Sequence, residues 1–190
     1  RWIFPGEVSR TDAVLTRSFD PVSGTEHRFR EVRMHIHTGQ SFAAIVLDLA
    51  HELVHASSEP AWDPYDPDLN PAIYISRSIE GPGGEVQAVA TECRIAREIF
   101  GAAASQGRCG KYFGSATAKV TDLARIRADF YRVGDWHSPL LVALGPLTAR
   151  LRQLSGKEPV FFSSTGRVPY PVALFEEFAE LNRRTCENAR

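Results

Sequence analysis

Two histidines and one glutamate within five residues form the pattern in this chain best suited to chemistry. They are His51, Glu52 and His55, in the order H-E-x-x-H. Residues four apart on a helix lie on one face, so the two imidazoles can bind a single metal ion. Glu52 lies beside that ion, where its carboxylate can take a proton from metal-bound water and pass it to a leaving group. The pattern predicts zinc-dependent hydrolysis with Glu52 as the general base.

The segment that carries this motif, residues 41–57, is predicted to be a largely buried helix. Its apolar residues recur every three or four positions, on a face largely different from that of the histidines. These apolar residues are Phe42, Ile45, Val46, Leu49 and Leu53. Zinc lowers the pKa of a bound water to about 7, so hydroxide would be available at neutral pH.

A second predicted helix, residues 85–100, follows a glycine-rich turn and offers the third zinc ligand. Zinc held by two histidines needs another protein ligand and leaves its fourth position for water. Glu85 and Glu92 are seven residues apart and share one helical face. We expect Glu85 to be the ligand because it follows the flexible glycines. Glu92 is the alternative. The glutamate that does not bind zinc accepts a hydrogen bond from a ligand histidine, or it pairs with Arg94 or an arginine beyond it.

Residues 27–38 are predicted to form a strand, because apolar and polar side chains alternate along them. The apolar face holds Val32, Met34 and Ile36. His35 and His37 share the other face, either as alternative metal ligands or as polar residues near the cleft. In zinc peptidases an edge strand commonly passes the metal, and an extended substrate can add to it as another strand. We expect this strand to take that role.

The rest of the chain indicates a single α+β domain over residues 1–190, with a small, mostly antiparallel sheet and a largely helical C-terminal half. Residues 1–26 are predicted to be irregular. Short strands are expected over 72–76 and 158–162, and helices over 116–132, 138–154 (with a kink at Gly145–Pro146) and 171–188.

Composition narrows the classes of partner. The formal net charge is −1 with both signs interspersed, which excludes a basic footprint for nucleic acid or anionic membranes. No apolar run approaches the roughly 18 residues of a membrane span. The three cysteines are too few for a disulfide framework, and both a Cys93–Cys109 bridge and free thiols remain open. We expect a monomer that acts on a protein or peptide.

The motif resembles that of the gluzincin zinc metallopeptidases, in which a helical glutamate follows the H-E-x-x-H helix some thirty residues later. Within that group, residues 49–56 (L-A-H-E-L-V-H-A) are similar to the metal helix of bacterial type III effector metallopeptidases and clostridial neurotoxin light chains. Residues 91–98 are similar to a helix of those effectors, with Cys93 as a departure, and Glu85 matches their downstream ligand segment in part. The resemblance covers residues 41–112.

This resemblance implies a zincin-like fold, peptide-bond hydrolysis and Zn²⁺ bound by His51, His55 and Glu85. It also favours a secreted or translocated bacterial protein. An arginine, tyrosine or histidine commonly stabilises the oxyanion in such enzymes, and Arg108, Tyr112 and His137 are our candidates.

Three other functions remain open from the sequence. The first is a zinc-dependent amidase or hydrolase acting on a non-protein substrate such as peptidoglycan. The second is a non-catalytic metal-binding module with a fourth protein ligand, and the third is a structural domain without metal.

Overall fold

A three-stranded sheet forms one side of the protein in the computed structural model, which describes residues 2–114, 122–163 and 167–188. The strands are β1 (Trp2–Gly6), β2 (Arg10–Asp20) and β3 (Thr25–His37), in the order β1-β3-β2. Strand β1 is parallel to β3, and β2 is antiparallel to it. The predicted strand over 27–38 is thus confirmed, whereas the prediction that 1–26 is irregular is wrong. Strand β3 is also central rather than an edge.

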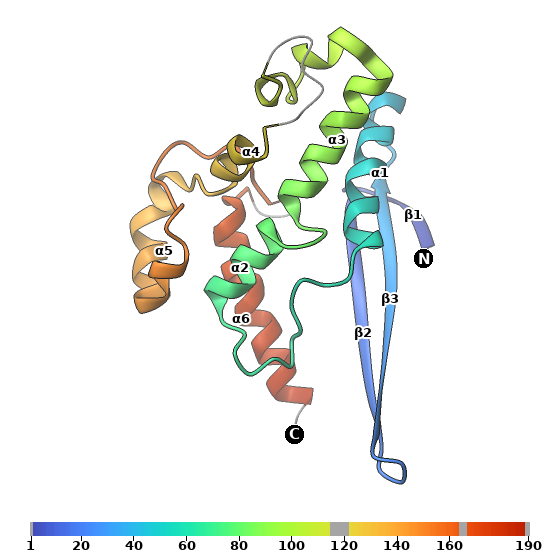
Figure 1. Ribbon diagram of the computed structural model, residues 1–190, viewed down its shortest axis with the longest axis vertical. Helices are drawn as coiled ribbons and strands as arrows, with labels where there is room; N and C mark the ends of the chain where they lie inside the picture. Colours follow the sequence, from blue (N-terminus) through green and yellow to red (C-terminus); the bar gives the residue numbers. More distant parts are fainter. Residues whose placement is uncertain (1, 115–121, 164–166, 189–190) are drawn as a thin grey trace.

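Strands β2 and β3 form a long hairpin that extends beyond the helices (Figure 1). Its turn is closed by the Asp20 carboxylate, which accepts hydrogen bonds from the Val22 backbone N–H (2.9 Å) and the Ser23 hydroxyl (2.6 Å). Gly24 follows with a φ of +68°, a conformation that favours glycine. These local bonds fix the turn, so the register of the hairpin is set by its own sequence.

Helix α1 (Phe42–Ser57) packs between the sheet and helix α3 (Figure 1). The predicted apolar face of β3 is buried, and Val32 and Met34 contact Ala56 of α1. The predicted stripe on α1 is wrong at both ends, because Phe42 is 81% exposed and Leu53 41% exposed. The sheet on one side of α1 and helix α3 on the other determine which of its residues are buried.

The remaining helices enclose the main hydrophobic core. They are α2 (Pro71–Glu80), α3 (Glu85–Phe100), α4 (Leu123–Phe130), α5 (His137–Leu144) and α6 (Tyr170–Asn188), with short 3₁₀ helices at Gly101–Gln106, Gly110–Tyr112, Gly134–Trp136 and Gly145–Arg150. The predicted helices over 85–100 and 171–188 are confirmed. The mixed α+β class is confirmed as well.

Other predicted elements need correction. The expected strand over 72–76 lies within helix α2, because the Asn70 side chain caps Ile73 N and Pro71 occupies the first turn. The predicted helix over 138–154 is interrupted, because α5 ends at Leu144 and Gly145, with a φ of +54°, follows as its C-cap. Of the predicted helix over 116–132, α4 covers Leu123–Phe130, and residues 116–121 lie outside the described part of the chain.

The expected strand over 158–162 is wrong within the described residues. Only an isolated bridge from Phe162 to Pro169 occurs there. The Cys93–Cys109 disulfide is present and ties α3 to the loop after it, while Cys186 is an exposed free thiol. In the described part of the chain, no helix is long and apolar enough to cross a membrane.

Candidate metal centre

Helices α1 and α3 bring three potential metal ligands together, namely His51, His55 and Glu85. One ligand atom from each residue lies within 4.8 Å of the other two. His51 Nε2 is 3.3 Å from Glu85 Oε2, and His55 Nε2 is 3.3 Å from Glu85 Oε1. Ligands about 2.0–2.1 Å from a tetrahedral zinc are about 3.3–3.4 Å from one another. The spacing and chemistry of these donors therefore suit a metal ion.

The glycine-rich turn before α3 fixes the orientation of His55. The Nδ1 of His55 lies 2.7 Å from the carbonyl oxygen of Gly83. Donation from Nδ1–H to this carbonyl leaves the Nε2 lone pair for a metal. Gly83 has a φ of +69°, and a Cβ there would come within 2.3 Å of the Ser58 Cβ. The turn thus needs glycine to bring this carbonyl to the imidazole.

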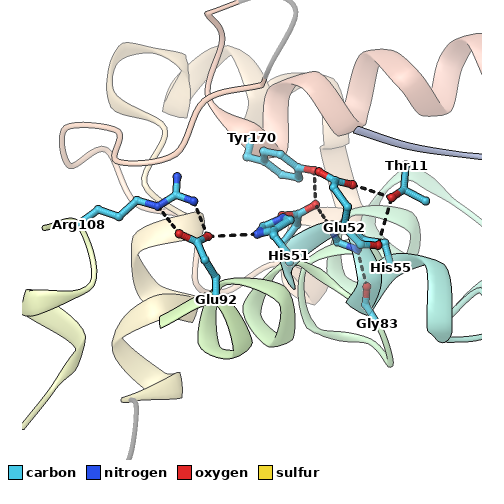
Figure 2. A network of polar contacts seen from close by, with 9 residues as sticks. Thr11, His51, Glu52, His55, Gly83, Glu92, Arg108 and Tyr170 are labelled. Carbon is cyan, nitrogen blue, oxygen red and sulfur yellow. Dashed lines mark hydrogen bonds and ion pairs between the residues drawn. The ribbon is translucent and has the colours of Figure 1, made fainter. Parts of the chain in front are cut away.

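Glu92 contacts the other nitrogen of His51, as the sequence left open. Its Oε2 lies 3.4 Å from His51 Nδ1, an ion-pair distance that lacks hydrogen-bond geometry. Glu92 is fully buried, and Arg108 binds both of its carboxylate oxygens, with Nε 2.7 Å from Oε1 (Figure 2). The disulfide joins Cys93, which follows Glu92, to Cys109, which follows Arg108. The bridge therefore holds Arg108 near Glu92.

Glu52 is positioned by the edge strand β2. Thr11 Oγ1 donates a hydrogen bond to Glu52 Oε2 at 2.6 Å and also lies 3.2 Å from the Glu52 carbonyl oxygen (Figure 2). Ser9, just before β2, donates to Asp48 of α1 and accepts from the His37 backbone N–H at 3.0 Å. These contacts attach the start of β2 to α1, beside the motif.

Burial raises the pKa of the Glu52 carboxyl, whereas the Thr11 hydroxyl and the two nearby imidazoles lower it; the net direction is upward.

Tyr170, the first residue of α6, adds a contact to this cluster from a third helix. Its hydroxyl donates a hydrogen bond to Glu85 Oε1, and its ring packs edge-on against Phe130. Burial raises the pKa of Tyr170 well above 10, and the charge of Glu85 raises it further. The hydroxyl therefore remains protonated and available as a donor at neutral pH.

The electrostatics of the cluster favour a cation. Burial opposes protonation of His51, but the carboxylates of Glu85 and Glu92 outweigh it and raise the His51 pKa to about 10. Burial also opposes ionisation of Glu85, yet its contacts with the two histidines and Tyr170 lower its pKa to about 2. With neutral imidazoles, Glu52, Glu85, Glu92 and Arg108 give a formal charge of −2, which a divalent cation would balance.

A cleft of about 1030 Å³ opens onto these residues. Residues Val8–Ala13 and Leu15 line one side, so the edge of β2 that has no partner strand in the described part of the chain borders the cleft. Helices α2 and α6 and the loop after α1 line much of the remainder, and this loop contributes Trp62 and Tyr65.

Of the three residues expected to stabilise an oxyanion, only Arg108 lines the cleft, and it is paired with Glu92. Tyr112 is buried, with its hydroxyl 3.0 Å from Asp129 Oδ2. His137 begins helix α5 and does not line the cleft.

The two strand histidines are not part of the described cluster either. His35 lies 3.5 Å from Asp12 on the sheet face opposite α1 and stacks on Phe4. His37 follows on that face.

Thr11 and Tyr170 had no sequence signal, because each reaches the centre only through tertiary contacts. Comparisons with protein-family models, curated proteins and solved structures found no match to this chain.

Proposed function

We propose that this protein is a zinc-dependent metallopeptidase of the gluzincin type. One observation carries the proposal: the Nε2 atoms of His51 and His55 converge on Glu85, while Glu52 lies beside them on the same cleft. Two imidazoles, one carboxylate and an open position form a typical donor set of catalytic zinc. A bound zinc would supply Lewis acidity and lower the pKa of a water molecule.

The residues of the chain have distinct roles in this proposal. His51, His55 and Glu85 would hold the ion, and Glu52 would accept a proton at Oε1 or Oε2 and return it to the leaving amine. The Thr11 hydroxyl keeps the Glu52 carboxylate oriented through its 2.6 Å hydrogen bond. Tyr170 donates at the metal ligand Glu85, and we assign it, ahead of Tyr112 and His137, as the donor nearest a developing oxyanion.

The edge of β2 supports a peptide substrate over a small molecule. Among the described residues, β2 has a partner strand on one side only, and its other edge borders the cleft. Free backbone groups at a sheet edge can bind an extended peptide as an additional strand. Thr11 lies on this strand and contacts Glu52, so such a peptide would pass beside the general base.

The test combines metal analysis with hydrolysis. We expect about one zinc per chain in the wild type, lost in His51→Ala, His55→Ala and Glu85→Ala but retained in Glu52→Gln. On a mixed peptide library, Glu52→Gln should lower hydrolysis by about 10²–10⁴-fold. Glu59→Gln, an exposed cleft carboxylate, is the matched control. A wild type that fails to bind zinc, or a Glu52→Gln variant as active as Glu59→Gln, would refute the proposal.

A further inference from the structure

Glu177 is a carboxylate in the wall of the same cleft, and the proposed chemistry does not use it. It lies seven residues after Tyr170 on α6, and both residues line the cleft. Seven residues are about two helical turns, so the two side chains share a face about 10 Å apart along the axis. Tyr170 contacts the candidate metal ligand Glu85. Glu177 therefore lies in the same cleft, about two helical turns away from the candidate metal centre.

The surroundings of Glu177 leave its negative charge unbalanced. Tyr74 donates a hydrogen bond to its Oε2 at 3.4 Å, and no ion pair to Glu177 occurs among the described residues. Nearby arginines in the cleft wall already have acidic partners: Arg77 lies 3.9 Å from Asp66, and Arg184 lies 2.7 Å from Glu180. A cation entering the cleft would therefore find Glu177 available.

An aromatic wall stands beside this carboxylate. The Trp62 ring packs on Tyr74 with centroids 4.7 Å apart, and Trp62 is only partly buried where it lines the cleft. A long basic side chain could lay its aliphatic stem on such a ring and extend its charge to the carboxylate. Desolvation raises the pKa of Glu177, and the charge of Glu85 raises it further. Trp62, Tyr74 and Glu177 therefore lie together in the wall of the cleft.

We infer that Glu177, with Tyr74 and Trp62, forms a subsite that selects a lysine or arginine side chain of the substrate. The inference rests on the proposed peptidase function. An extended chain advances about 3.3 Å per residue, so the roughly 10 Å separation along α6 corresponds to about three residues. The selected basic residue lies about three positions from the scissile bond.

The test measures binding, so that it does not depend on turnover. The probes are fluorescent decapeptide mixtures with Lys, Gln or Glu at one fixed position, titrated into zinc-treated Glu52→Gln protein. Charge-assisted hydrogen bonds to a carboxylate suggest about a 10-fold or greater preference for Lys over Gln. Adding Glu177→Gln should reduce this preference to below about 3-fold, and Glu177→Lys should reverse it toward Glu. Glu176→Gln, an exposed neighbour outside the cleft lining, is the matched control.

The outcomes separate this inference from the proposed function. A preference for Lys that survives Glu177→Gln, or equal binding of the Lys and Gln mixtures, overturns the subsite even if the protein hydrolyses peptides. A preference that Glu177→Gln abolishes and Glu176→Gln preserves supports the subsite. Failure of the proposed function would appear separately, as wild-type protein without zinc or without Glu52-dependent hydrolysis.

Discussion

The variant Glu92→Gln should weaken zinc binding without removing a ligand. Glu92 is fully buried, and its carboxylate lies 3.4 Å from His51 Nδ1. When His51 Nε2 binds a cation, Nδ1–H becomes the donor to this carboxylate, which raises the basicity of the imidazole. Replacing such a partner typically costs 10–100-fold in metal affinity, which is about 1.4–2.7 kcal/mol. We expect the upper half of this range, because the variant also leaves the Arg108 charge uncompensated.

The double variant Glu92→Gln/Arg108→Gln distinguishes this electrostatic argument from a packing defect. Arg108 is bound to both oxygens of Glu92, so its positive charge opposes a cation only when Glu92 is neutral. Removing that charge should recover about 3-fold or more of the affinity lost in Glu92→Gln. A packing defect would instead persist or worsen, because the second substitution removes more contacts.

The assay is a competition titration with a chelator of known zinc affinity, at pH 7.5 and fixed ionic strength. Glu98→Gln, an exposed position on the same helix, is the control and should match the wild type. Zinc affinities within 2-fold for Glu92→Gln and Glu98→Gln would refute the role assigned to Glu92. If the double variant recovers none of the lost zinc affinity, the role assigned to Arg108 is refuted.

Three further predictions concern the surroundings of the site. Thr11→Val removes a hydrogen bond that lowers the Glu52 pKa. The acidic limb of the kcat/KM–pH profile should therefore move to higher pH. The control Thr16→Val, at an exposed position of β2, should leave the profile unchanged. Tyr170→Phe keeps the ring against Phe130 but removes the donor to Glu85, so zinc affinity should fall by about 10-fold; wild-type affinity would contradict this contact. Replacing both Cys93 and Cys109 by serine opens a bridge spanning 16 residues and should cost about 3 kcal/mol in denaturant unfolding. Unchanged stability would mean that the α3 loop is held by other contacts.

Local patterns in the sequence predict the parts of the site that lie on single elements. His51 and His55 share a helical face because they are four residues apart, and the structure places both Nε2 atoms at Glu85. The hairpin strand β2 was missed because its polar and apolar residues do not alternate cleanly, and most of its side chains are exposed. Its pairing is dictated by β3 and by the Asp20 turn rather than by burial.

Contacts between distant segments could not be predicted in this way. Thr11 reaches Glu52 across 41 residues, and Tyr170 reaches Glu85 across 85 residues. Neither residue type is unusual in its local sequence, and both act through how β2 and α6 pack beside α1 and α3. The exposed ends of the α1 stripe have the same origin, because the layers that cover a helix decide which of its apolar residues are buried.

Glu85 and Glu92 lie at different nitrogens of His51 in the structure. Seven residues on one helix give both carboxylates the same face, so spacing cannot rank them. The imidazole of His51 has two nitrogens on opposite sides of its ring, and α3 runs beside α1 so that Nε2 faces Glu85 while Nδ1 faces Glu92. The two glutamates are thus complementary: one lies where a cation would bind, and the other supports the ring from behind. This arrangement uses both acids of α3, and Arg108 is the partner that stabilises the buried charge of Glu92.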